Sequence, residues 1–269
     1  MEVSVVAVGA EVGVAALGAC ALGDGFACGG AAFGACAVLE GAIRFGSCGV
    51  EGCGADEALE VVYWIVPNPT LMLILPYTAQ TDPARAVWVA ERALQGGVNW
   101  VTLRVRELPA RLALDVALEL RRLTRAHGAW LGVNPYPALA EWVGADALHL
   151  PEAAPPYTPP DPMWLGRSVH STDAAQRAEA EGCRYLLVGT MFPTASHPDQ
   201  PPAGIPLLRA VRRAVSIPLI AIGGITPERV DECIQAGAQG VAVLSGIADA
   251  PDPADAATRY WAALRACAT

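Results

Sequence analysis

The sequence predicts a (β/α)8 barrel that follows a low-complexity N-terminal segment. Eight apolar runs typical of buried strands recur between residues 71 and 269 at intervals of about 25 residues, and helical segments separate most of them. Glycine or serine follows the seventh and eighth runs, in AIGGIT (221–226) and VAVLSG (241–246). Barrels of this class bind phosphate with the loops after these two strands. A doubly wound open sheet is the alternative, and the paired glycine loops favour the barrel.

Residues 1–60 form the low-complexity segment. They hold nearly half of the chain's 27 glycines, and neither helical nor strand periodicity persists in them. No basic stretch precedes an apolar core, so we expect no signal peptide. Glycines interrupt every apolar run well short of the ~20 residues that a membrane span needs. We therefore expect a disordered segment, or a natural start further along the chain near Met72, and a cytoplasmic protein with no membrane partner.

Charge and cysteine usage exclude several classes of function. The formal net charge is -9, and residues 1–60 contribute -7 from eight acids and Arg44, which leaves -2 for residues 61–269. A nearly neutral barrel offers no basic face to a nucleic acid. All 18 basic residues are arginine, so lysine Schiff-base chemistry is excluded. Five of the eight cysteines lie in the first 53 residues without any CxxC pair, which argues against zinc.

The first half of the barrel follows from apolar runs and helix signals. Asp82 and Pro83 predict the start of a helix that ends at Gly96 and Gly97. A second helix reaches His127, and a short one runs from Pro137 to Gly144. The predicted strands are 71–75, 100–105, 130–134 and 146–150.

The second half begins with a proline-rich segment, residues 151–162, in which we expect no helix. Ser171 or Thr172 caps the next helix, and a further helix covers residues 205–215. The last two helices open at Thr226-Pro227 and Asp252-Pro253. The predicted strands are 164–168, 185–189, 218–223 and 240–244.

Polar side chains at the ends of these strands are the candidate site, because barrel enzymes work at that face. His170 follows the fifth strand directly, and imidazole is suited to moving protons near neutral pH. His149 is expected to be a satisfied interior histidine, whereas His197 is either solvated or functional. No carboxylate ends a strand, and Glu152 comes nearest, so we expect no metal site. The other candidates are Arg104, Arg106, Asn134, Ser168, Thr194 and Ser196 for substrate, and Gly223, Gly224, Ser245 and Gly246 for phosphate.

Three motifs carry a family resemblance. GTMFPTASHP, IPLIAIGGITPERV and AGAQGVAVLSGI resemble the thiamine phosphate synthase/TenI superfamily of barrels, over roughly residues 72–266. The synthase of that superfamily joins an aminopyrimidine diphosphate to a thiazole phosphate, with Mg²⁺ held by two aspartates. The chain has Pro135 and Ala154 at the matching places, and His197 and Arg106 replace two lysines.

The TenI branch of the superfamily is a thiazole tautomerase, an isomerase that aromatises a carboxylated thiazole phosphate without a metal. GRSVHS and LSGIADAPDP resemble this branch more closely, and its catalytic histidine matches His170. The resemblance therefore predicts a tautomerase with no cofactor. Ser168 and Asn134 would orient the ligand, and Arg104 or Arg106 would pair with its carboxylate. The alternatives are the Mg²⁺-dependent synthase and a barrel that binds thiazole phosphate without turnover. The resemblance also implies a homodimer.

Overall fold

The computed structural model describes residues 66–194 and 201–267, together with five short strands earlier in the chain. The chain divides into two compact units, Met1–Val66 and Pro67–Thr269. The strands of the first unit form one two-stranded and one three-stranded antiparallel sheet. They are β1 (Phe26–Cys28), β2 (Ala31–Phe33), β3 (Cys36–Leu39), β4 (Ala42–Phe45) and β5 (Val62–Trp64). Cys28 and Cys36 fall in β1 and β3. The expectation for the rest of residues 1–60, with the other three cysteines, lies outside the described residues.

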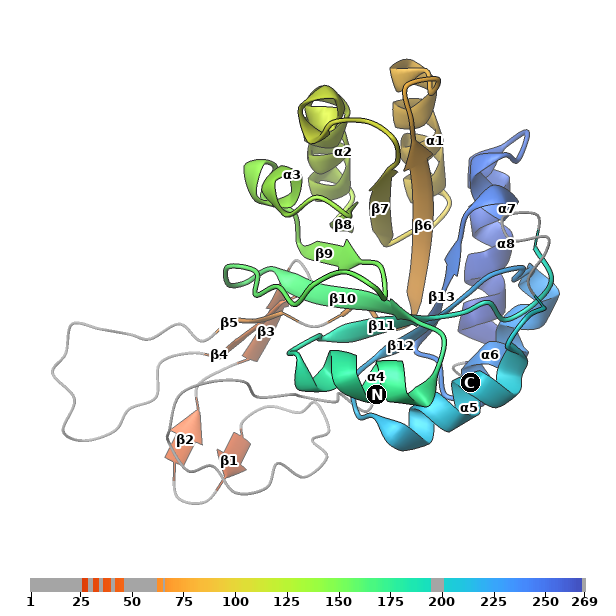
Figure 1. Cartoon of the computed structure of the whole chain (residues 1–269). Helices are drawn as coiled ribbons and strands as arrows, with labels where there is room; N and C mark the ends of the chain where they lie inside the picture. Colours follow the sequence, from red (N-terminus) through yellow and green to blue (C-terminus); the bar gives the residue numbers. More distant parts are fainter. Residues whose placement is uncertain are drawn as a thin grey trace, which may run out of the picture. The chain divides into compact units, whose positions relative to one another are not determined.

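The second unit is a closed barrel of eight parallel strands, which confirms the predicted fold (Figure 1). Strands that are neighbours in the barrel are also neighbours in the chain, β9 and β10 included. The last strand, β13, pairs with the first, β6, and so closes the barrel. The strands are β6 (Thr70–Tyr77), β7 (Trp100–Val105), β8 (Trp130–Asn134), β9 (Ala147–Leu150), β10 (Trp164–Val169), β11 (Tyr185–Val188), β12 (Leu219–Ile222) and β13 (Gly240–Val243).

Helices connect these strands around the outside of the barrel (Figure 1). Residues 151–163, all of which the structure describes, form no helix between β9 and β10, as the prolines of this segment predict. The short helix α7, directly after β13, is absent from the sequence prediction. The helices are α1 (Pro83–Gln95), η1 (Ala110–Ala113), α2 (Leu114–Ala126), α3 (Pro137–Trp142), α4 (Thr172–Ala180), α5 (Gly204–Ala214), η2 (Pro227–Arg229), α6 (Val230–Gln235), α7 (Ser245–Ala248) and α8 (Pro253–Ala266).

Side-chain caps set the starts of three helices. Asp82 accepts a hydrogen bond from the Ala84 backbone N–H at 3.0 Å, and Asp252 caps α8 in the same way. Ser171 caps α4 by accepting from the Ala174 N–H at 3.1 Å. Each cap satisfies a backbone donor that the first helical turn leaves free, and is worth about 1 kcal/mol.

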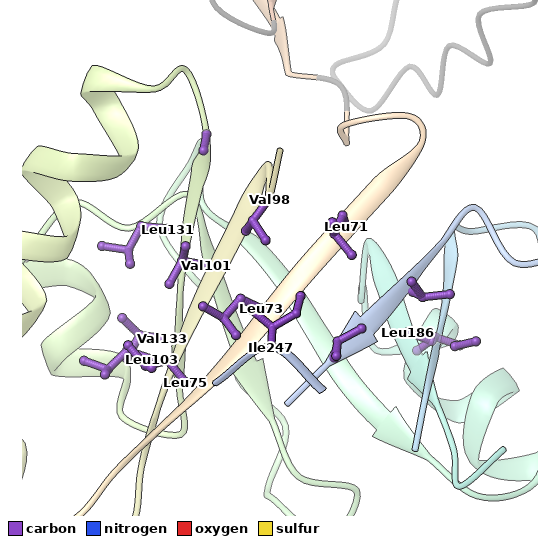
Figure 2. Packing of buried hydrophobic residues seen from close by; sticks show 14 of the residues in the cluster. Leu71, Leu73, Leu75, Val98, Val101, Leu103, Leu131, Val133, Leu186 and Ile247 are labelled. Carbon is purple, nitrogen blue, oxygen red and sulfur yellow. The ribbon is translucent and has the colours of Figure 1, made fainter. Parts of the chain in front are cut away.

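Residues of each barrel strand alternate between two layers. In β6, Leu71, Leu73 and Leu75 join the apolar layer between strands and helices (Figure 2). Burying one such leucine stabilises the fold by about 1.5–3 kcal/mol. The residues between them, Met72 and Ile74, point into the barrel instead. Both layers are buried, so the strand appears in the sequence as an unbroken apolar run.

Large aromatic side chains fill one end of the barrel interior. The rings of Trp100 and Trp130 lie 4.9 Å apart, those of Trp100 and Tyr185 4.8 Å, and those of Trp130 and Trp164 5.4 Å. A Cβ on Gly166 would come within 2.0 Å of the Tyr185 ring, so the absence of a side chain there makes room for the tyrosine. These four aromatic residues begin their strands, so they close the amino-terminal end and leave the carboxyl ends open for polar groups.

Two further expectations concern thiols and membranes. Cys183 and Cys233 are buried free thiols, as predicted, and Cys267 is partly buried. Burial raises the pKa of the Cys233 thiol to about 12, so this thiol stays protonated and unreactive near neutral pH. Within the part of the chain that the structure describes, no helix is long and apolar enough to cross a bilayer.

A shortened chain beginning at Pro67 is expected to keep the melting temperature of the full chain, because it retains the whole second unit. The Thr70 hydroxyl donates to the Pro67 carbonyl, and the Asn99 side chain binds Pro69 O and Leu71 N at 2.8 and 2.9 Å. A chain beginning at Met72, the start that the sequence indicates, lacks these contacts. Since Leu71 is fully buried, we expect that chain to lose about 2–5 kcal/mol of unfolding free energy. Denaturant titration of the two chains measures the difference, and equal stabilities would contradict it.

Candidate active site

A cavity of about 210 Å³ opens at the carboxyl ends of the barrel strands. Most of the residues that the sequence predicts for the site line it. They are His170, Arg104, Asn134, Ser168, Thr194, Gly223, Gly224, Ser245 and Gly246. Thr102 and His149 also line the cavity, although neither is among the predicted substrate residues.

Two predicted substrate residues do not contribute to this lining. Arg106 is exposed, because β7 ends at Val105 and the chain turns away through Glu107, whose φ is 53°. The Arg106 backbone N–H donates to Tyr77 O at 2.9 Å, which holds the residue at the rim. Ser196, like His197, lies in residues 195–200, outside the described chain.

Arg104 is the cationic side chain on the inner face of β7. It is partly buried, and burial together with the nearby charge of Arg106 lowers the pKa of its guanidinium. Among the described residues, no ion pair joins Arg104 to a carboxylate. A desolvated guanidinium next to a second one favours an anionic ligand. The structure therefore favours an anion ligand over a salt-bridged structural arginine.

His170 pairs with Glu152 at the mouth of the cavity. The Glu152 Oε2 atom lies 2.7 Å from His170 Nδ1 and accepts a hydrogen bond from the His170 backbone N–H at 3.0 Å. The carboxylate holds the ring by one nitrogen, so that Nε2 is left to exchange a proton with a ligand. Helix α4 is capped by Ser171, so His170 is not its cap. This use of Glu152 could not be predicted from the sequence, because the two partners are 18 positions apart in the chain.

His149 is buried within β9, and both of its ring nitrogens have partners. Nδ1 lies 3.3 Å from the Tyr185 hydroxyl, and Nε2 lies 2.8 Å from Ser168 Oγ. Burial, followed by the charges of Arg104 and Arg167, lowers the pKa of His149 to about 3. The residue is thus a neutral, hydrogen-bonded interior histidine, as the sequence predicts.

Two glycine segments also line the cavity, namely Gly223 and Gly224 after β12 and Gly246 in the first turn of α7. Gly223 and Gly224 have φ values of 103° and 64°, which disfavour any residue with a side chain. A Cβ on Gly224 would lie 2.4 Å from Pro193 O, so it would strike the loop after β11. A Cβ on Gly246 would lie 2.3 Å from the Tyr260 hydroxyl. The absence of a side chain at Gly224 therefore lets the loop after β11 approach, and that at Gly246 makes room for the Tyr260 hydroxyl. The main chain of these glycines lines the cavity.

Gly224→Ala is expected to lower stability and raise KM because its Cβ would displace residues 192–193, which connect the cavity-lining Thr190 and Thr194. Gly128→Ala is the matched control, since Gly128 has a similar φ of 62° and a Cβ added there would meet no atom within 4 Å. In both variants an alanine at positive φ costs about 1 kcal/mol of backbone strain. Only Gly224→Ala adds a steric clash with the loop after β11. Thermal unfolding and steady-state kinetics compare the pair. Equal effects would show that the contact with the loop is unimportant.

The donor set does not fit Mg²⁺. Among the described residues, no aspartate or glutamate lines the cavity, and no group of three or more His, Cys, Asp or Glu side chains could hold a metal. Mg²⁺ prefers carboxylate and water oxygens. At the place of one resemblance-implied aspartate, the Ala154 carbonyl accepts from Arg167 Nη1 at 2.6 Å. The same nitrogen reaches Glu152 O at 3.1 Å, so a buried guanidinium holds this loop.

Comparisons with known proteins agree on one family. The family model described as thiamine monophosphate synthase matches residues 71–247. The chain is similar to the thiamine-phosphate synthase of Natronomonas pharaonis, with 41% identity over 67% of this chain and 88% of the relative. It is also similar to that of Moorella thermoacetica, with 42% identity over 62% of this chain and 82% of the relative. The solved thiamine phosphate pyrophosphorylase of Pyrococcus furiosus superposes with a TM-score of 0.65 and 29% identity, covering 75% and 98% of the two chains. The chain therefore belongs to the thiamine monophosphate synthase family.

Proposed function

We propose that this enzyme of thiamine biosynthesis binds a thiazole phosphate in the mouth cavity and joins it to an aminopyrimidine diphosphate. The names of the relatives favour this transferase over the tautomerase that the sequence analysis preferred. The observation that carries the proposal is that two kinds of anion-binding group line one cavity. Glycine main chain and the Arg104 guanidinium both line it, and two phosphorylated substrates need more than one such group.

The residues suggest how the chain serves this reaction. The thiazole nitrogen donates its electron pair to the methylene carbon of the aminopyrimidine, while the carbon–oxygen bond to diphosphate breaks. The diphosphate leaves with the electron pair of that bond, so negative charge grows on its oxygens. Arg104 and the Ser168 hydroxyl line the cavity and would stabilise this charge. The main chain at Gly223, Gly224 and Gly246 would hold the thiazole phosphate so that its nitrogen faces the reacting carbon.

Mg²⁺ would supply charge neutralisation in the synthase reaction that the resemblance implies. Because the residues present do not fit this ion, no step of the proposed reaction depends on it. We propose instead that guanidinium, hydroxyl and backbone N–H groups bind the anions, and that the enzyme needs no metal. The neighbouring Arg106 adds positive charge at the rim and would disfavour a cation there.

The thiazole tautomerase is the second candidate, and one feature of the site favours it. The His170–Glu152 pair at the mouth is an acid–base arrangement that a proton shift needs, whereas bond formation at the thiazole nitrogen does not. The tautomerase substrate carries a carboxylate and a phosphate, which the same anion-binding groups would accept.

Incubation of the purified full chain with the substrates of each reaction tests the proposal. We expect thiamine phosphate to form from the aminopyrimidine diphosphate and thiazole phosphate, which conversion to fluorescent thiochrome detects. Aromatisation of the carboxylated thiazole phosphate without thiamine phosphate would establish the second candidate. Binding of thiazole phosphate without either product would leave a non-catalytic barrel and overturn both.

A further inference from the structure

A line of polar side chains leads from the barrel interior to the cavity. Tyr185, His149 and Ser168 come from β11, β9 and β10, and all three point inward. The tyrosine hydroxyl lies 3.3 Å from His149 Nδ1, and His149 Nε2 lies 2.8 Å from Ser168 Oγ. Tyr185 is fully buried, His149 is 2% exposed, and Ser168 lines the cavity. The line therefore has one closed end and one end that meets a ligand.

The closed end fixes the direction of the hydrogen bonds. Burial raises the pKa of Tyr185 well above 10, so its phenol keeps the proton, and a buried O–H needs an acceptor. Among the described residues, His149 Nδ1 is the acceptor within hydrogen-bond distance of it. Nδ1 must then carry the lone pair. Since a neutral imidazole carries one N–H, the proton lies on Nε2, which donates to Ser168 Oγ.

We propose that Tyr185 and His149 are positioning residues that fix the Ser168 hydroxyl as a hydrogen-bond donor to the ligand. Because Ser168 Oγ accepts from Nε2–H, its own hydrogen is left for the cavity. A ligand oxygen with negative charge is the matching partner, next to the Arg104 guanidinium on the same lining. The inference rests on the proposed function only for the identity of that ligand.

The neutral state of His149 supports the fixed direction. The ring is enclosed, and the positive charges of Arg104 and Arg167 act on it from β7 and β10. With its pKa lowered to about 3, the ring stays neutral throughout the physiological range. A protonated ring would also donate to Ser168, but it could not accept from Tyr185.

Histidine ring ¹H–¹⁵N correlation spectra of the full chain test the direction without any ligand. Signals are assigned by elimination with the His127→Asn, His170→Asn and His197→Asn variants. We expect His149 as the neutral Nε2–H tautomer at pH 7, and we expect Tyr185→Phe to move the Nδ1 resonance as the hydrogen bond is lost. A neutral Nδ1–H tautomer, or a charged ring, would overturn the proposal whatever reaction the enzyme catalyses.

A double-mutant cycle on thiamine phosphate formation tests the consequence. Ser168→Ala is expected to lower kcat/KM by about 10- to 100-fold, the effect of one hydrogen bond to a charged oxygen. Tyr185→Phe should lower it by a smaller factor in the wild-type background and have no further effect beside Ser168→Ala. Effects that multiply in the double variant would show that Tyr185 acts through general packing, and would overturn its positioning role.

Discussion

Arg104→Met is expected to lower kcat/KM for thiamine phosphate formation by about 10²–10³-fold. Hydrogen bonds to charged groups are worth about 1.5–3 kcal/mol each, and a guanidinium can donate two to one anion. Methionine keeps an unbranched chain of similar reach against the barrel wall, so the loss reports on charge. Steady-state kinetics with thiazole phosphate and the aminopyrimidine diphosphate measure the effect.

Arg106→Met is the matched control for this prediction. The two arginines lie two residues apart, but only Arg104 lines the cavity, whereas Arg106 is exposed beyond the end of β7. We therefore expect only a few-fold change from Arg106→Met. Equal losses in the two variants would show that a diffuse positive field, and not a direct contact from Arg104, holds the anion.

His170→Asn is expected to separate the two candidate reactions. Asparagine keeps a polar side chain at the mouth but cannot carry a proton, so tautomerisation of the carboxylated thiazole phosphate should fall by about 10²–10⁴-fold in kcat. Thiamine phosphate formation should change only a few-fold, because bond formation at the thiazole nitrogen needs no imidazole. Both assays use the same purified variant.

Glu152→Gln and His127→Asn complete the comparison. Glutamine at position 152 keeps a side chain of similar size near His170 Nδ1 but removes the charge, so we expect a smaller loss in the tautomerase assay. His127 is exposed at the end of α2, away from the cavity lining, and its replacement should leave both rates unchanged. A large loss of thiamine phosphate formation in His170→Asn alone would give the histidine a role in the synthase reaction.

The sequence predicts the barrel well because its local signals agree with the tertiary structure. The apolar run of β7 is found at Trp100–Val105, as predicted, and the Asp82-Pro83 signal opens α1. Alternation along β7 also explains the position of Arg104. Inward and outward residues alternate, so Thr102 and Arg104 face the interior while Leu103 joins the outer layer.

The features that could not be predicted from the sequence depend on contacts between distant segments. The Glu152–His170 pair forms between two loops that the barrel brings together. The position of Arg106 depends on where β7 ends, and the role of Gly224 on how closely the loop after β11 approaches it. The helix α7 has only four residues, too few for a periodic pattern to reveal it.

We propose that this site binds its anionic substrates without a metal. The most direct test is kcat/KM for thiamine phosphate formation by the purified full chain, measured in excess EDTA and in excess Mg²⁺. Because Arg104 lines the cavity and no carboxylate of the described residues does, we expect the two values to agree within a few-fold. Activity that disappears in EDTA and returns with Mg²⁺ would contradict the account.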